Sequence, residues 1–120
     1  PDCMGYIEAF KAWYDAMCIK PLYLEHRLDS AKHRLSGGVD MIAILRGDTE
    51  PTIIDIKTPV NASKTWRLQT AAYKMLAEEE LGLKIGRRIA LQLPRDGLKA
   101  KVIEYTEHAK DQDLYLKALE

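Results

Sequence analysis

The sequence predicts an α/β protein with a mixed central β-sheet flanked by helices, arranged as an α/β/α sandwich. Apolar residues at helical spacing mark three segments, and shorter runs rich in β-branched residues mark strands between them. The elements follow in the order helix, three strands, helix, two strands, helix. Residues 52–57 form a nearly continuous apolar run, which is typical of a central strand covered on both faces.

The first helix is predicted over residues 5–19, with Asp2 as a candidate N-cap and Pro21 ending it. Aromatic and aliphatic residues recur along it at helical spacing, which indicates a buried stripe. The stripe comprises Tyr6, Ile7, Phe10, Trp13, Tyr14 and Met17. Such a stripe is expected to be core rather than a base-stacking surface.

Three strands are predicted next, over residues 22–29, 37–45 and 52–57. Side chains in the first are expected to alternate between faces, with Glu25 opposite in direction to Leu24 and Leu28. Gly37 and Gly38 lead into the second strand and permit a bend and a close backbone approach.

A second helix is predicted over residues 63–81, with Ser63 as N-cap and Gly82 as C-terminal cap. Its expected buried face comprises Leu68, Ala72, Met75 and Leu76. The three glutamates at 78–80 are expected to form a solvated face. Strands over 88–94 and 98–105 follow, joined by a hairpin turn at 95–97.

The last element is a short helix predicted over residues 110–119. Four of its residues are expected to pack inward: Leu114, Tyr115, Ala118 and Leu119. With no linker or internal repeat in the sequence, residues 1–120 are interpreted as a single domain.

Composition narrows the class of protein. A hydrophobic content of 47% and a charged content of 30% are those of a soluble globular domain, and no apolar run or signal pattern predicts a membrane span or secretion. Cys3 and Cys18 lie near opposite ends of one predicted helix and are expected to remain reduced. The formal net charge of zero argues against a simple nucleic-acid binder.

The second and third strands each carry an acid among aliphatic neighbours, Asp40 and Asp55. If the strands pair, the two carboxylates come together, and Lys57 projects from the same face as Asp55. Like charges in contact are costly unless neutralised, and Mg²⁺ binds through one or two carboxylates and substrate phosphates. The alternative is a pair of solvent-facing acids with Lys57 as an ordinary ion-pair partner.

The second helix carries a polar and aromatic strip close to this pair. Gln69 and Tyr73 are one turn apart, and Trp66 is expected to extend the same surface strip. Lys64 and Arg67 lie in the first turn, where a helix N-terminus favours a phosphate group. The alternative is an ordinary helix boundary with a half-buried tyrosine.

Taken in order, the motifs Gly37-x-x-Asp40, Asp55-x-Lys57 and Gln69-x-x-x-Tyr73 resemble the PD-(D/E)xK nuclease superfamily. The resemblance is closest to RecB-like and Cas4-like exonuclease domains, phage members included, and covers most of the chain. It implies a restriction-endonuclease-like α/β/α fold and a metal-dependent exonuclease that hydrolyses DNA phosphodiesters in replication, recombination or repair. It also implies a cytoplasmic setting, in a bacterium or a phage-infected cell.

The resemblance also implies roles for the site residues. Asp40, Asp55 and the backbone carbonyl of Ile56 would bind Mg²⁺ or Mn²⁺, and Lys57 would orient or help deprotonate the attacking water. Glu25, the acid in the preceding strand, would act as an outer metal ligand, a water orienter or a partner for a basic side chain.

The helix residues implied to position the DNA backbone are Gln69, Tyr73, Lys64 and Arg67. The expected partner is DNA that is single-stranded or has a free end.

The first predicted helix lacks the histidine that RecB-like and Cas4-like members usually present from an upstream helix. The expectation is that this motif preceded Pro1, or that this branch works without it. Two alternatives therefore stay open: a non-catalytic DNA-binding or assembly module of the same fold, and a nicking or structure-selective endonuclease.

Overall fold

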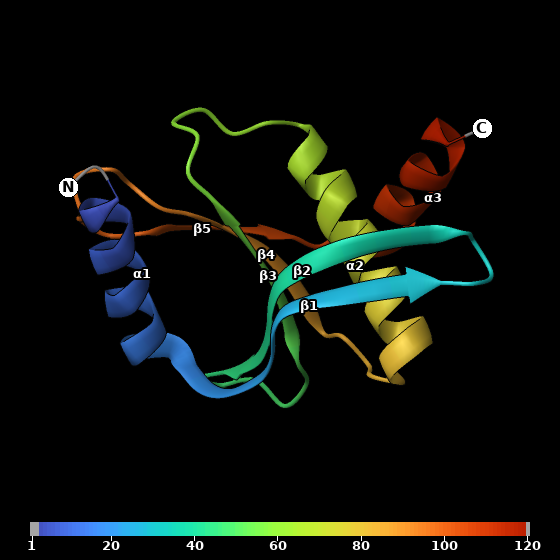
Figure 1. The fold of residues 1–120 in the computed structure, drawn as a ribbon, viewed down its shortest axis with the longest axis horizontal. Helices are drawn as coiled ribbons and strands as arrows, with labels where there is room; N and C mark the ends of the chain where they lie inside the picture. The colour runs from blue at the N-terminus through green and yellow to red at the C-terminus, as the bar shows by residue number, and fades with distance from the viewer. Residues whose placement is uncertain (1–2, 120) are drawn as a thin grey trace.

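A computed structural model describes residues 3–119 of the chain, so the predicted N-cap Asp2 lies outside the described residues. The elements follow the predicted order (Figure 1). They are α1 (Met4–Met17), β1 (Cys18–Ser30), β2 (Leu35–Leu45), β3 (Thr52–Lys57), α2 (Thr65–Leu81), β4 (Arg87–Gln92), β5 (Lys101–Tyr105) and α3 (His108–Ala118). The prediction of an α/β fold with a mixed central sheet is confirmed.

The sheet has the strand order β1-β2-β3-β4-β5. Only β3 and β4 run parallel, and the chain crosses between them through α2. The other neighbouring strands are antiparallel. In Figure 1, α1 lies at one end of the molecule, while α2 and α3 lie together at the other.

Two hydrophobic clusters show that the sheet is covered on both faces. Met41 and Ile54 pack with residues of α1, whereas their neighbours Ile42 and Ile53 pack with residues of α2. Adjacent residues of a strand point to opposite faces, so helices cover both sides. The first four residues of β3 are all buried, as the continuous apolar run predicted.

The start of the chain differs from the prediction in two ways. Pro21 does not end a helix; it lies inside β1, where irregularities in the β1–β2 register flank it and absorb its missing donor. Ile7, expected in the buried stripe of α1, is 56% exposed, because the sheet contacts the opposite side of α1 through Ala9 and Trp13.

The strict alternation expected in β1 is also wrong. Glu25 has a φ of 48°, in the left-handed region, which interrupts the pleat. Leu24 is consequently 58% exposed, although Leu28 on the same predicted face is fully buried.

The boundaries of α2 are close to those predicted, and Gly82 caps it with a φ of 67°. The N-cap is Lys64 rather than Ser63, although the Ser63 hydroxyl still accepts the Thr65 N–H at 3.2 Å. The expected buried face is partly wrong, because Leu68 and Met75 are only half-buried. Thr70, Ala71 and Ala77 are buried instead.

The glutamates at 78–80 are not simply a solvated face. Glu79 accepts a hydrogen bond from the Ser30 hydroxyl at 2.8 Å, and Glu80 accepts the Asp29 N–H. Glu78 accepts hydrogen bonds from the Lys74 ammonium at 2.7 Å and from the Ile85 N–H at 3.0 Å. The C-terminal end of α2 is thereby tied to the end of β1 and to the chain leading into β4.

The hairpin of β4 and β5 is confirmed, but its strands are shorter and its connection longer than predicted. The inward face predicted for α3 is wrong: Leu114 and Leu119 are 43% and 52% exposed. The buried residue of α3 is Asp111, which forms an ion pair with the fully buried Arg88 of β4. A buried arginine requires such a partner, so charge rather than apolar pattern determines how α3 docks.

No helix within residues 3–119 is long and apolar enough to cross a membrane.

Candidate functional site

The site lies where β2 and β3 separate. Their pairing covers only residues 41–43 and 52–54, and the next residue along each strand is an acid, Asp40 or Asp55. Beyond that point the Ile56 N–H donates to Asp40 Oδ2 at 2.7 Å instead of continuing the ladder. The separation of the strands gives both carboxylates room, so the predicted juxtaposition of the acids follows directly from where the pairing ends.

Asp55 is the more buried acid, at 4% exposure. Its Oδ2 atom lies 3.1 Å from Lys57 Nζ but accepts no hydrogen bond of good geometry among the described residues. The pKa of Asp55 is raised from its ordinary 3.8 to about 6, because burial and the neighbouring Asp40 raise it more than Lys57 lowers it. The site therefore holds a carboxylate that lacks sufficient positive charge around it.

Lys57 is positioned by three neighbours. Its Nζ atom lies beside Asp55, donates to Gln69 Oε1 at 2.8 Å and sits 5.8 Å from the centre of the Trp66 ring. Trp66 is 4% exposed, so its predicted place on the surface strip is wrong. It forms a buried wall under the lysine. Sequence reasoning missed this role, although Trp66 and Gln69 stand three residues apart, a spacing that puts both on one helix face.

Tyr73 lies over the start of β2. A Cβ added at Gly37 would come within 3.1 Å of the Tyr73 ring, whereas one at Gly38 would meet nothing within 4 Å. Burial raises the pKa of Tyr73, and the charges of Asp55 and Asp40 add to the effect. The close approach expected at these glycines therefore occurs at Gly37, where the Tyr73 ring packs against the backbone. This packing places the tyrosine near both acids.

The remaining predicted site residues are Glu25, Lys64 and Arg67, of which the first two are exposed. Glu25 is exposed on β1, at a level between the register pairs Leu24–Met41 and His26–Val39. Lys64 is exposed at the N-terminus of α2.

Arg67 does not face the predicted strip. Its guanidinium pairs with Asp111 at 2.7 Å and Glu107 at 3.1 Å, and hydrogen bonds from it to Asp111 are the main cause that raises its pKa. This cation helps to hold α3 against α2, and its predicted contact with DNA stays a prediction.

The donor set suits a hard divalent cation. Two carboxylates face one another, and one of their oxygens is buried without a hydrogen-bond partner. Oxygen ligands of this type are those that Mg²⁺ and Mn²⁺ prefer. Within residues 3–119 no group of three or more His, Cys, Asp or Glu side chains lies close enough together to hold a metal.

Two acids and a lysine thus lie together at the open end of a central strand, on a mixed sheet covered on both faces. The family model of the PD-(D/E)XK nuclease superfamily matches residues 4–120, and the chain belongs to this superfamily. A comparison with curated proteins found no match. Membership implies a hydrolase that acts on nucleic acid with the help of divalent metal ions.

Proposed function

We propose that this protein is a divalent-metal-dependent exonuclease that hydrolyses DNA phosphodiesters, of the RecB-like and Cas4-like branch. The observation that supports it best is Asp55 Oδ2, a buried carboxylate oxygen without a hydrogen bond and opposite a second acid. An isolated like-charge pair of this kind is destabilising, and a bound cation would remove the penalty.

Asp40, Asp55 and the Ile56 carbonyl would hold Mg²⁺ or Mn²⁺. The Ile56 N–H that binds Asp40 Oδ2 leaves the other oxygen of that carboxylate available. When bound, the cation would polarise a phosphoryl oxygen and lower the pKa of a water molecule. The cation would also offset the repulsion between the Asp40 and Asp55 carboxylates.

Lys57 would orient the attacking water and donate to the charge that develops on the phosphate. The ion pair with Asp55 and the hydrogen bond to Gln69 restrict the rotamers of a side chain that is otherwise flexible. Fixing a charged donor before the reaction is the main way in which such groups accelerate hydrolysis. Gln69 thus acts on the reaction first through Lys57, and it reaches DNA only through its amide NH₂.

Tyr73 and Lys64 would contact the substrate backbone. The Tyr73 hydroxyl stays protonated because its pKa is raised, so it can donate to a phosphate oxygen near the acids. Lys64 lies exposed at the N-terminus of α2, where the helix dipole also favours an anion. Glu25 would act as an outer ligand or water orienter beyond Asp40.

We further propose that the substrate is single-stranded DNA or DNA with a free end, and that the enzyme works in the cytoplasm of a bacterium or a phage-infected cell. The motif order Gly37-x-x-Asp40, Asp55-x-Lys57 and Gln69-x-x-x-Tyr73 supports this assignment, since it resembles phage-type exonuclease domains.

The test compares linear and circular single-stranded DNA of one sequence, with Mg²⁺, Mn²⁺ or EDTA. We expect the linear strand to be degraded with either metal, the circle to survive, and both Asp55→Asn and Lys57→Met to be inactive. Asp113→Asn, an exposed acid on α3, is the matched control and should retain full activity. Cleavage of the circle would indicate an endonuclease instead, and binding without cleavage under every condition would indicate a non-catalytic module.

A further inference from the structure

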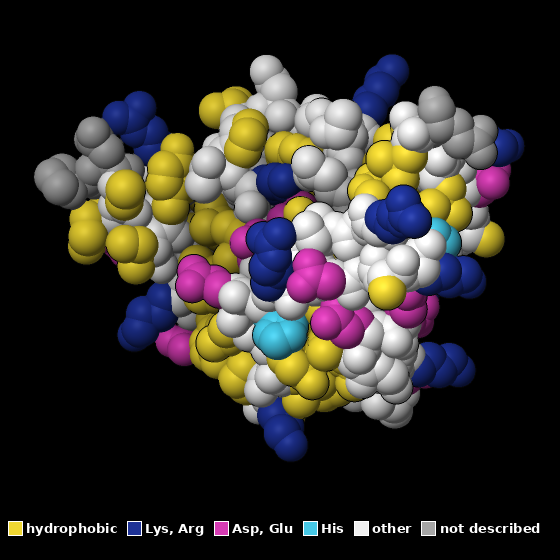
Figure 2. All heavy atoms as spheres, turned by 45° about the vertical axis from the view of Figure 1, so that its right-hand side comes forward, with side chains coloured by type: hydrophobic (Ala, Val, Ile, Leu, Met, Phe, Trp, Pro, Cys, Tyr) yellow, Lys and Arg dark blue, Asp and Glu magenta, His cyan; other side chains and the backbone are white. Residues whose placement is uncertain are grey.

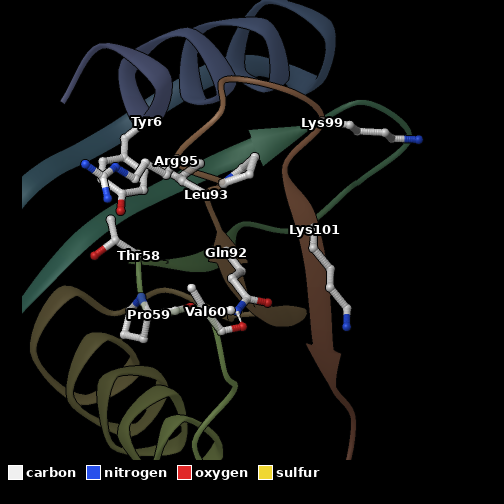
Figure 3. A pocket seen from close by; sticks show the side chains of 10 residues that line it. Tyr6, Thr58, Pro59, Val60, Gln92, Leu93, Arg95, Lys99 and Lys101 are labelled. Atoms are coloured by element: carbon white, nitrogen blue, oxygen red, sulfur yellow. Dashed lines mark hydrogen bonds between the residues drawn. The ribbon is translucent and has the colours of Figure 1, made fainter. Parts of the chain in front are cut away.

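A hollow of about 440 Å³ lies at the C-terminal ends of β3 and β4 (Figure 3). Its walls come from α1, from the loop after β3 and from the connection between β4 and β5. The residues that matter for its chemistry are Tyr6, Pro59, Val60, Gln92, Lys99 and Lys101. Its volume falls in the range of small-ligand sites, roughly 300–1,000 Å³.

The hollow adjoins the nuclease site. Thr58, which lines it, directly follows Lys57 in the chain, and Gln92 is the register partner of Lys57 on β4. The Leu93 N–H also donates to the Lys57 carbonyl at 2.8 Å. A nucleic-acid strand with one phosphate at Asp55 and Lys57 therefore has this hollow next to it.

The walls are held by specific contacts. Gln92 Nε2 donates to the carbonyls of Pro59 at 2.7 Å and Val60 at 2.8 Å, which fixes the loop after β3. On the other side, a Cβ at Gly5 would lie 1.6 Å from the Arg95 carbonyl oxygen, so only glycine permits this approach of α1 to the β4–β5 connection. That contact fixes Tyr6, the next residue of α1, at the edge of the hollow.

The rim is positively charged. Lys99 and Lys101 are exposed, and neither forms an ion pair with an acid within residues 3–119. In Figure 3 their side chains extend outward from β5 and the loop before it, while Tyr6 stands on the opposite side. The hollow thus combines an aromatic and apolar interior with cations at its edge.

We propose that this hollow binds one unpaired nucleotide of the strand being cut, with its base among Tyr6, Pro59 and Val60 and its phosphates at Lys99 and Lys101. The proposal rests on the proposed function, because the adjoining site must act on nucleic acid. Aromatic platforms beside basic tracks are the general means of binding single strands. A base inside a duplex cannot enter the hollow, so the hollow selects single-stranded over paired DNA at this position.

The test measures binding of wild type and variants to a twelve-nucleotide single strand and to a blunt-ended duplex of two strands, in EDTA so that no cleavage occurs. Fluorescence anisotropy gives the dissociation constant at several salt concentrations. The slope of log affinity against log salt is negative. For the Lys99→Glu/Lys101→Glu variant we expect its magnitude to fall by about 1.4, since each contact with a single-strand phosphate contributes about 0.7. The control is Lys20→Glu/Lys32→Glu, a pair of exposed lysines on β1 and the β1–β2 turn, with the same charge change.

The base-binding part is tested with Tyr6→Leu, which keeps an apolar side chain against the core. We expect roughly a five- to hundredfold loss of single-strand affinity, the value of one stacked base, with duplex affinity unchanged. An equal loss for strand and duplex, or a salt slope that changes no more in Lys99→Glu/Lys101→Glu than in the control, would overturn the proposal.

These outcomes are separable from those of the nuclease assay. A protein that binds the single strand as predicted but cleaves nothing with any metal contradicts the proposed function and supports the hollow. A protein that cleaves normally while the Tyr6 and lysine variants bind like wild type contradicts the hollow alone.

Discussion

Replacing Asp55 with asparagine should stabilise the metal-free protein above neutral pH. Burial and the neighbouring Asp40 raise the pKa of Asp55 from 3.8 to about 6. Between these values the folded state binds more protons than the unfolded state, so the free energy of unfolding falls as pH rises through this window. The stabilisation by the protonated carboxyl is fully present below about pH 4 and is lost above about pH 6.

The magnitude follows from the size of the shift. Each pKa unit corresponds to about 1.36 kcal/mol, so the shift of roughly two units costs the wild type about 3 kcal/mol at pH 7 and above. Solvent screening reduces this cost only slightly, since the Asp55 side chain is only 6% exposed. Asparagine has nearly the same shape and no charge, so the variant avoids this cost.

The assay is urea unfolding in EDTA at intervals from pH 4 to pH 8. The quantity of interest is the difference in unfolding free energy between Asp55→Asn and wild type. Burial lowers the pKa of His108, so this residue makes the free energy of unfolding rise with pH over part of the window. His108 is present in both proteins, so its contribution cancels in the difference. Asp113→Asn, at an exposed acid, should run parallel to wild type. A difference for Asp55→Asn that is constant with pH would refute the reasoning.

Further predictions concern other parts of the molecule. Asp111→Asn should destabilise the protein by about 3–5 kcal/mol in urea unfolding, because it leaves the fully buried Arg88 without its charge partner. Mg²⁺ at a hundredfold excess over its Kd should stabilise the fold by about 2.7 kcal/mol in thermal melts. At one and the same metal concentration, the stabilisation should be larger with Mn²⁺ than with Mg²⁺. Asp40→Asn should abolish that effect, as should lowering the pH below 5. Gln69→Ala should lower the turnover number more than the DNA affinity. Tyr73→Phe should weaken the DNA affinity more than the metal affinity. Paired kinetic and binding assays in which either order is reversed would contradict the role of that residue.

The central strand and the acid pair were predictable because they depend on local patterns. A continuous apolar run predicted that β3 would be covered on both faces, and a two-residue period placed Asp55 and Lys57 together. The parts that failed depend on distant residues. Trp66 is buried and Lys57 lies over its ring, and a helical pattern alone does not show which neighbour will cover a face.

Two further failures have different physical causes. Glu25 adopts a left-handed φ that interrupts the alternation of side chains between the two faces of β1, and no pattern in the surrounding residues predicts it. On α3 the apolar residues predicted one inward face, but the charge of Arg88 on β4 selects the face that carries Asp111. Leaving a buried charge unpaired costs more than exposing one leucine, so the ion pair prevails over the apolar pattern.

The neutral net charge, which argued against nucleic-acid binding, also has a structural explanation. Figure 2 shows basic and acidic side chains mixed on the face turned to the viewer, without one large basic patch. Arg67, Arg87 and Arg88 are held by acids within the fold, whereas Lys99 and Lys101 have no such partner within residues 3–119. Exposed charges are screened beyond about one Debye length, about 10 Å at 0.1 M salt. A phosphate at this rim therefore interacts with the nearby lysines and not with the net charge of the whole protein. A neutral domain of this kind is expected to bind long duplex weakly, and its affinity for DNA is expected to depend on the metal and on an unpaired strand.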